Sequence, residues 1–287
     1  MRPQNVKAKI FLDGSDIEET KKILDLLGFL DGQTTNPANF AKSPDVAERI
    51  KRGDKFDRDE VYAAYKKRVQ ELSALLPDGA ISIEVYADKT TTTEAMFAQG
   101  KEMFGWIPNA HIKFPTTAAG LEAAARAIAE GLRVNMTLVF TQAQAAAVYA
   151  ATKGAKRGSV FVSPFIGRWY DREVNGMDLI KNILKMYQGG DGHVEVLTSS
   201  VRTAEQFEEA LAIGTDIITA YFKAIKAWGQ AGLPTPPADS FKTDPNLQPV
   251  PYQQFSLDQP WSAFDVRHEL TDKGLESFAN DWNNLIK

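Results

Sequence analysis

The chain has no cysteine among its 287 residues. Disulfide bonds, thiolate nucleophiles and cysteine-ligated metal sites are therefore excluded. Histidine is also scarce, since only His111, His193 and His268 occur. Their scattered positions match no metal-ligand spacing. We therefore expect no metal site.

The sequence also lacks an excess of positive charge and long apolar runs. Its formal net charge is −4, which predicts no basic surface for nucleic acid. No apolar run approaches the length of about 18 residues that indicates a membrane span. Residues 1–14 lack the apolar core of a signal peptide. We expect a cytoplasmic protein that binds neither nucleic acid nor membranes.

Short apolar runs alternate with amphipathic stretches along most of the chain. The hydrophobic content of 44% and the charged content of 24% are close to the averages for globular proteins. The apolar runs predict strands at residues 7–13, 29–35, 80–87, 110–114, 133–139, 158–163, 193–198 and 215–219. The amphipathic stretches predict helices at residues 16–28, 57–76, 90–104, 117–130, 141–153, 175–188, 203–212 and 221–230.

This alternation indicates an α/β fold with parallel strands. Eight strand–helix units favour a closed (β/α)8 TIM barrel, which we expect to occupy residues 1–232. Residues 233–287 would form a C-terminal extension within the same domain. Its first part is rich in proline and polar residues, whereas residues 271–287 show helical periodicity and predict a helix packed on the barrel.

Polar side chains occupy one face of five of the expected strands. Because alternate strand residues share a face, Glu84 lies opposite an apolar set of side chains. The same holds for Asp13, Lys113, Asn135 and Ser163. The apolar sets suit the helix layer, so these polar groups are expected to point into the barrel near the C-terminal ends of the strands. Barrel active sites lie at that end.

Each polar residue also has a purely structural explanation. Asp13 could cap the following helix, and Glu84 and Asn135 could be hydrogen-bonded core residues. Lys113 could extend its ammonium group to the surface. Burying an unpaired polar group costs several kcal/mol, however, and five strands would need separate explanations. The combination therefore favours a functional site.

An inward lysine beside two carboxylates suits covalent catalysis. Burial lowers the pKa of an amine, so that a neutral fraction can attack a ketone and form a Schiff base. A carboxylate can transfer the protons needed for imine formation and for carbon–carbon cleavage. The protonated imine serves as the electron sink, so we expect no cofactor. The glycines match neither the phosphate-binding loop nor the dinucleotide fingerprint.

The chain resembles the transaldolases, Schiff-base enzymes of the pentose-phosphate pathway, over nearly its whole length. The most specific motifs are "TTNP" at residues 34–37 and "SPFIGR" at residues 163–168, together with "HIKFPTTAAG" at residues 111–120. The resemblance implies that Lys113 forms the Schiff base and that Asp13 transfers protons around carbon–carbon cleavage. It implies that Glu84 and Thr137 position a catalytic water.

The resemblance also implies a set of substrate-binding residues. Sugar hydroxyls would be bound by Asn36 and Asn135, with Thr34 or Thr35 beside them. Ser163 and Phe165 would line the pocket, and the phosphate would be bound by Arg168, Ser200 and Arg202. Paired arginines suit a phosphate because guanidinium groups bind it bidentately.

The implied reaction transfers a dihydroxyacetone unit from sedoheptulose 7-phosphate or fructose 6-phosphate to glyceraldehyde 3-phosphate or erythrose 4-phosphate. One alternative is a fructose-6-phosphate-aldolase type of enzyme that releases free dihydroxyacetone. In that subfamily glutamine is expected at the position of Glu84 and tyrosine near Phe165, so this chain favours transfer. A sulfonated sugar would also suit the arginines. A non-catalytic barrel would predict the loss of Lys113, Asp13 or Glu84.

Three side chains and the assembly state have no single interpretation. His111 could fill the lower layer of the barrel or form a hydrogen bond near Lys113. Trp169 and Tyr170 follow Arg168 and could shape the acceptor side of the site. The C-terminal extension, residues 233–287, could cover the barrel or another subunit, so the protein could be a monomer or a homo-oligomer.

Overall fold

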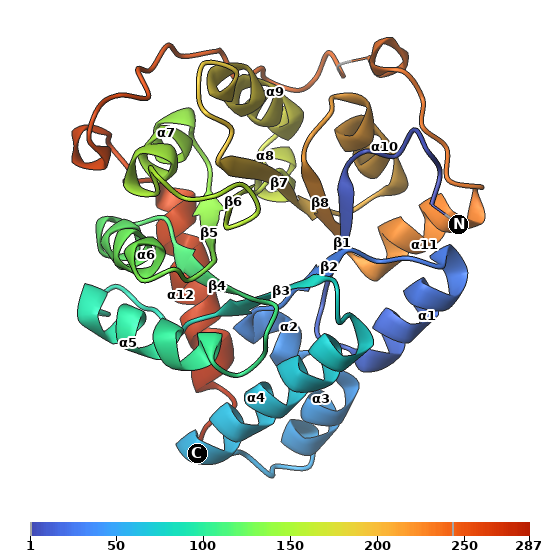
Figure 1. Cartoon of the computed structure of the whole chain (residues 1–287). Helices are drawn as coiled ribbons and strands as arrows, with labels where there is room; N and C mark the ends of the chain where they lie inside the picture. Colours follow the sequence, from blue (N-terminus) through green and yellow to red (C-terminus); the bar gives the residue numbers. More distant parts are fainter. Residues whose placement is uncertain (1, 243) are drawn as a thin grey trace.

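The computed structural model of the protein describes residues 2–242 and 244–287, and its strands close into a barrel (Figure 1). All neighbouring strands are parallel and follow one another in chain order around the barrel. The predicted TIM barrel is confirmed. The strands are β1 (Lys9–Asp13), β2 (Gly32–Thr34), β3 (Ala80–Glu84), β4 (Ala110–Pro115), β5 (Val134–Val139), β6 (Val160–Pro164), β7 (Val194–Val201) and β8 (Ile217–Ala220).

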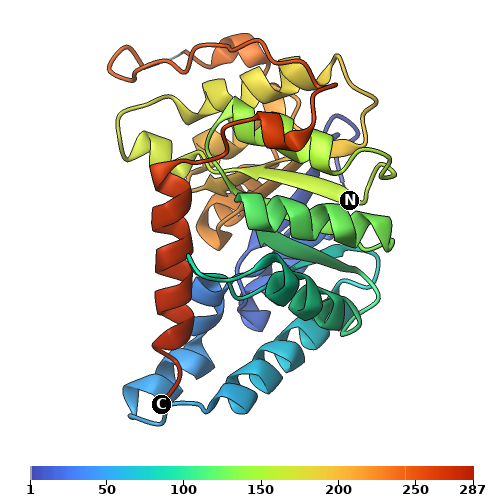
Figure 2. The ribbon, with the colours of Figure 1, turned by 90° about the vertical axis from the view of Figure 1, so that its left-hand side faces the viewer.

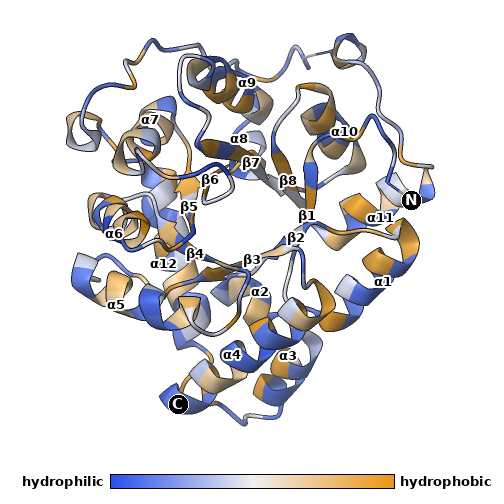
Figure 3. Cartoon of the chain, in the orientation of Figure 1, coloured by the Kyte–Doolittle hydropathy of each residue, from blue (hydrophilic) through white to orange (hydrophobic). Residues whose placement is uncertain are grey.

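Helices surround the barrel, and their hydrophobic residues gather on the sides that adjoin the strands (Figure 3). The long helices of the barrel are α1 (Ile17–Leu27), α4 (Arg58–Leu75), α5 (Thr93–Phe104), α6 (Ala118–Ala129), α7 (Gln142–Ala151), α9 (Gly176–Tyr187), α10 (Ala204–Ala212) and α11 (Phe222–Gln230). In residues 2–242 and 244–287 no helix has the length and apolar character that crossing a membrane requires.

Side-chain caps decide where several helices begin. The Asp16 carboxylate accepts from the backbone N–H of Glu18 at the start of α1, and the Thr141 hydroxyl forms a capping box with Gln144 in α7. The helix expected from residue 90 begins later, because Thr92 caps α5. The hydroxyl and backbone N–H of Thr90 both donate to the Asp88 carboxylate, which holds this segment in a turn.

Three short helices were not predicted from the periodicity of the sequence. They are α2 (Pro37–Ala41), α3 (Pro44–Lys51) and α8 (Gly167–Tyr170). Two begin with proline directly after a capping-type residue, Asn36 or Ser43, and this arrangement suits a first helical turn. None is long enough to show a reliable 3.6-residue repeat. α2 and α8 follow β2 and β6 and lie next to the predicted site.

The lower half of the barrel is filled by side chains. Phe11, Phe161, Leu197 and Ile217 form a buried apolar layer inside it. His111 belongs to this layer, because its ring stacks on Phe161 with ring centroids 4.2 Å apart. Its Nε2 lies 2.9 Å from the carbonyl oxygen of Gly158, and burial lowers the pKa of His111 to about 4. His111 therefore fills the lower layer as a neutral ring.

The C-terminal helix α12 (Glu269–Asn283) lies across one end of the barrel beside α2 (Figure 2). The Trp282 ring packs against Phe40 of α2 with centroids 6.2 Å apart. The Thr271 hydroxyl donates to the carbonyl oxygen of Leu138 at 2.9 Å, which attaches the helix to the end of β5. Two 3-10 turns, Ala238–Ser240 and Trp261–Ala263, interrupt the extended segment before it.

We predict that Gly32→Ala destabilises the barrel. A Cβ at Gly32 would overlap the Ala80 carbonyl oxygen and approach the Phe11 Cε1 to 2.7 Å. The oxygen belongs to the barrel wall and the ring to its packed interior, so overpacking should lower the free energy of unfolding by about 1–3 kcal/mol in urea titrations. Gly189→Ala is the control, since its Cβ would lie 3.6 Å from the Met186 oxygen. Equal stability of the two variants would contradict the prediction.

Candidate active site

A buried ion pair lies at the centre of the candidate site. Glu84 ends β3 and Lys113 lies in β4, and the strand register pairs the two residues directly. The Lys113 Nζ is 2.8 Å from the Glu84 Oε2, and both side chains are about 95% buried, with exposures of 4% and 5%. The ammonium group also donates to the Thr35 carbonyl oxygen at 3.1 Å. The expected inward direction of both side chains is therefore what the structure shows.

Asp13 lies at the end of β1 on the same side of the barrel. Its Oδ1 accepts from the Asn39 Nδ2 at 2.7 Å and from the Thr34 hydroxyl at 3.2 Å. Burial raises the pKa of Asp13, although the charge of Lys113 acts to lower it. Asn39 was not predicted, because it lies in the short helix α2 and no periodic pattern distinguishes it.

The pKa of the second carboxylate, Glu84, is raised as well. Burial raises the pKa of Glu84, while Lys113 lowers it and Asp13 raises it further. The charge of Lys113 thus acts on both carboxylates, although only Glu84 forms an ion pair with it. Both are consequently better proton acceptors than an exposed Asp or Glu, and this is useful for acid–base chemistry near neutral pH.

Asn135 is held in one orientation by hydroxyl groups of two other strands. Its Nδ2 donates to the Ser82 hydroxyl at 3.0 Å, and its Oδ1 accepts from the Ser163 hydroxyl at 2.6 Å. The nearby Thr137 hydroxyl is buried and makes no hydrogen bond within the described part of the chain. A buried polar group of this kind usually has a water or ligand partner. Thr137 is thus suited to hold a water molecule.

The residues of the "TTNP" motif make different contacts in the site. The Thr34 hydroxyl lies 2.6 Å from the Thr219 hydroxyl, in addition to its bond to Asp13. The Thr35 side chain points instead to Tyr65, with the two oxygens 2.6 Å apart, so only its backbone carbonyl reaches Lys113. The Asn36 Oδ1 caps α2, which leaves its Nδ2 for a ligand.

Backbone irregularities alter the direction of two strands near the site. β5 shifts register between Met136 and Val139, and Leu138 has a φ of 59°. β7 shifts register before Val201, and Ser200 has a φ of 61°. Bulges of this type redirect side chains and occur often next to active sites. The irregularity in β5 adjoins Thr137, and the irregularity in β7 includes Ser200, which lies beyond the strand predicted at residues 193–198.

The expected phosphate-binding residues gather at the ends of β6 and β7. A Cβ at Gly167 would lie 2.5 Å from the Ser200 Oγ and 2.6 Å from the Arg202 Nε, so glycine is required for this close approach. Arg202 makes a bidentate ion pair with Asp171, with contacts of 2.5 and 2.9 Å. Arg168 donates to the carbonyl oxygen of Leu270 at 3.3 Å. Burial lowers the pKa of Arg168.

The aromatic residues around α8 mainly hold this segment in place. Phe165 packs on Phe140 with ring centroids 5.8 Å apart. Trp169 contacts His268 at the start of α12, also through the rings, at 5.5 Å. The Tyr170 hydroxyl donates to the Asn175 Oδ1 at 3.3 Å and thereby connects α8 to α9.

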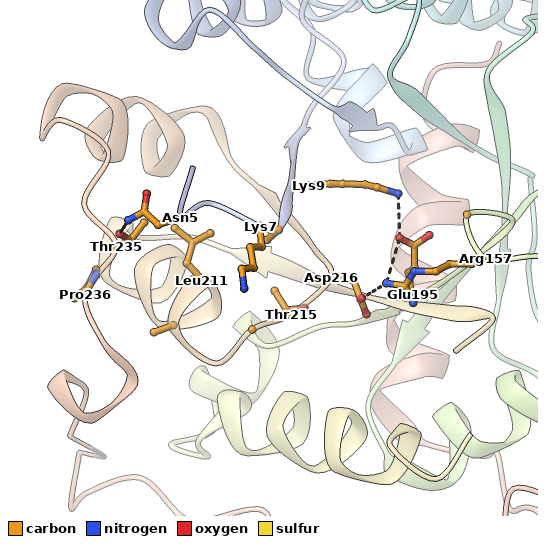
Figure 4. Close-up of a pocket in the computed structure, with 14 residues that line it drawn as sticks. Asn5, Lys7, Lys9, Arg157, Glu195, Leu211, Thr215, Asp216, Thr235 and Pro236 are labelled. Carbon is orange, nitrogen blue, oxygen red and sulfur yellow. Dashed lines mark hydrogen bonds and ion pairs between the residues drawn. The ribbon is translucent and has the colours of Figure 1, made fainter. Parts of the chain in front are cut away.

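A separate cavity of about 770 Å³ lies at the N-terminal ends of β1 and β7 (Figure 4). Its charged side chains largely pair with one another, since Lys9 contacts Glu195 at 3.0 Å and Arg157 contacts Asp216 at 2.5 Å. This end of the barrel is opposite the predicted site, and we interpret the pairs as stabilising contacts. In residues 2–242 and 244–287 no group of three or more His, Asp or Glu side chains could hold a metal ion.

Comparisons with known proteins show to which family the chain is similar. The family described as Transaldolase/Fructose-6-phosphate aldolase matches residues 10–287. A "Probable transaldolase" of Dehalococcoides mccartyi is 32% identical over 279 residues, which cover 97% of this chain and 100% of the relative. Proteins of the same name from Caulobacter sp. and Brucella ovis are 35% and 34% identical, with 96% of both chains covered in each case.

The raised pKa of Asp13 predicts that this carboxylate weakens the fold near neutral pH. A carboxyl whose pKa is higher in the folded chain imposes no penalty below its unfolded pKa; the penalty grows as pH rises from the unfolded to the folded pKa and is constant above that. Asp13→Asn keeps an acceptor for Asn39 and Thr34. We expect it to raise the free energy of unfolding at pH 7 by on the order of 1 kcal/mol. The gain should vanish below about pH 4.

Asp88→Asn is the control with the opposite sign. Hydrogen bonds from Thr90 and Thr91 lower the pKa of Asp88 to about 2, so its carboxylate supports the fold above the unfolded pKa. Urea unfolding at several pH values should show a loss of stability for Asp88→Asn at pH 7. If Asp13→Asn were no more stable than the parent protein at pH 7, the assigned penalty would be wrong.

Proposed function

Because the chain belongs to the transaldolase/fructose-6-phosphate aldolase family, we propose that it is a transaldolase with Lys113 as its Schiff-base residue. The donor is sedoheptulose 7-phosphate or fructose 6-phosphate, and the acceptor is glyceraldehyde 3-phosphate or erythrose 4-phosphate. The observation that supports this proposal best is the buried Lys113–Glu84 pair, 2.8 Å apart, with Asp13 at the same end of the barrel.

The first step forms an imine between Lys113 and the substrate ketone. Glu84 accepts a proton from the ammonium group, which leaves a neutral amine to attack C2 of the ketose. The resulting carbinolamine loses water after its hydroxyl is protonated. Glu84 returns the proton it accepted to this carbinolamine hydroxyl, and its raised pKa suits that role, while the Thr137 hydroxyl holds the departing water.

The second step breaks the bond between C3 and C4. Asp13 accepts the proton of the C4 hydroxyl, and the electron pair of the broken bond moves into the protonated imine to give an enamine. The aldose phosphate then leaves. The enamine attacks the aldehyde carbon of the acceptor, Asp13 returns its proton to the new hydroxyl, and water then hydrolyses the re-formed imine to release the new ketose and free Lys113. The raised pKa of Asp13 favours the acceptance of this proton.

The substrate is bound along the mouth of the barrel in this proposal. Asn135 and Ser163, already hydrogen-bonded to each other, contact the sugar hydroxyls near the imine together with the Nδ2 of Asn36, whose Oδ1 caps α2. Arg168 and Arg202 with Ser200 bind the phosphate. The sugar phosphates are the small-molecule partners in this proposal, while the cytoplasmic location and a homo-oligomer stay predictions.

We predict that fructose 6-phosphate and borohydride label Lys113. Reduction of the enamine's imine form should add one dihydroxyacetone unit to the protein, measured by intact mass and localised by peptide mapping. Lys113→Ala should show no adduct, whereas Lys7→Ala, a control at an exposed lysine, should be labelled like the parent protein. Circular dichroism would show that each variant is folded. An unlabelled parent protein, or label at another residue, would refute the mechanism.

Transfer and simple cleavage are separated by adding erythrose 4-phosphate. We predict that fructose 6-phosphate and erythrose 4-phosphate give sedoheptulose 7-phosphate and glyceraldehyde 3-phosphate in equal amounts, measured by mass spectrometry. Glu84 and Phe165 favour this outcome, because the aldolase type is expected to differ at both positions. Free dihydroxyacetone as the main product would instead assign the aldolase activity.

A further inference from the structure

Tyr221 occupies an unexplained position at the mouth of the barrel. It directly follows Ala220, the last residue of β8, which pairs with Leu12 of β1 and with Val201 of β7. Asp13 follows Leu12 at the end of β1, and Arg202 directly follows the end of β7. Tyr221 therefore stands between the carboxylate proposed for carbon–carbon cleavage and the arginine proposed for phosphate binding.

The Tyr221 side chain is accessible to a ligand. Its exposure is 39%, and only one other large hydrophobic side chain of the described residues, Leu26, is as exposed. A structural role in helix capping is not observed, because the side chain of Tyr221 makes no capping hydrogen bond to α11. A large aromatic residue exposed beside an active site is more informative than one exposed on an outer helix.

The groups around the Tyr221 hydroxyl come from both halves of the site. Burial raises its pKa and Asp13 raises it further, while Arg202, the Ser200 hydroxyl and Arg168 lower it. The net direction is upward, so the phenol is protonated and can donate a hydrogen bond near neutral pH. Its position adds a neutral donor to a site in which Arg202 already shares its charge with Asp171.

We propose that the Tyr221 hydroxyl donates a hydrogen bond to the phosphate of the sugar substrate and thereby selects phosphorylated sugars. The proposal rests on the function proposed above, and Tyr221 has no part in the proton transfers of that mechanism. Tyr221 follows β8, whereas Arg168 lies in α8 after β6, so the two donors would reach the phosphate from different strand ends. Together with Arg168, Ser200 and Arg202, Tyr221 would contact the phosphate from three consecutive strand ends, β6, β7 and β8.

Tyr221→Phe tests the proposal, because it removes the hydroxyl and keeps the ring. The loss of one hydrogen bond to a charged group should raise the KM for fructose 6-phosphate about tenfold. The dissociation constant of inorganic phosphate, measured by isothermal titration calorimetry, should rise by a similar factor. The rate of labelling by unphosphorylated dihydroxyacetone and borohydride should stay unchanged. Tyr252→Phe, a tyrosine next to Lys185 on the outer side, is the control.

The possible outcomes are distinguishable. If the phosphate affinity and the KM of Tyr221→Phe were unchanged, the role of Tyr221 would be wrong. The proposed function would still stand if Lys113 is labelled in the parent protein. An equal loss of activity on phosphorylated and unphosphorylated donors would also overturn it, because the hydroxyl would then act at the reacting carbons. Since phosphate binding needs no chemistry, the calorimetric result decides about Tyr221 even if the parent protein forms no Schiff base.

Discussion

The site depends on keeping one ammonium group and two carboxylates together inside a barrel. A single buried charge costs several kcal/mol, so Lys113 is tolerable only because the Glu84 carboxylate lies 2.8 Å away and the Thr35 carbonyl accepts a hydrogen bond. Asp13 leaves the group with one surplus negative charge, and the pKa values of both acids are raised. Asp13 and Glu84 are thus ready to accept protons, and holding them in the barrel lowers the stability of the fold.

Rigid surroundings keep these charges in position. The Tyr65 hydroxyl accepts from the backbone N–H of Glu84 and contacts the Thr35 hydroxyl, which connects α4 to β2 and β3. Tyr65 is itself packed against Trp282 of α12, with ring centroids 5.6 Å apart. The C-terminal extension therefore contributes to the site indirectly, since it packs against the residue that orients Thr35 and Glu84. Its other end contacts Arg168 through the Leu270 carbonyl oxygen.

The barrel and its inward polar residues were predictable, because both follow from local periodicity. Strands with alternating polarity place Glu84 and Lys113 on the interior face whatever their partners are. The contacts that complete the site were not predictable in this way. Asn39 lies in a helix that is too short to show a repeat. Tyr65 looks in the sequence like any other residue of the apolar face of α4, and only the folded chain brings its hydroxyl to Thr35 and Glu84. Thr35 also differs from expectation, because its side chain turns to Tyr65 and only its backbone reaches Lys113.

The ion pair at the phosphate end of the site is exposed to solvent, unlike the Lys113–Glu84 pair. Arg202 is exposed and pairs with Asp171, and an ion pair this exposed is worth about 1 kcal/mol or less. Such a partner can orient the guanidinium group without preventing a doubly charged phosphate from binding to it. Selectivity at this end must then come from geometry, because salt and water weaken every exposed charge. The close packing of Gly167 against Ser200 and Arg202 supplies part of that geometry, and a neutral hydroxyl at the end of β8 would supply a further part.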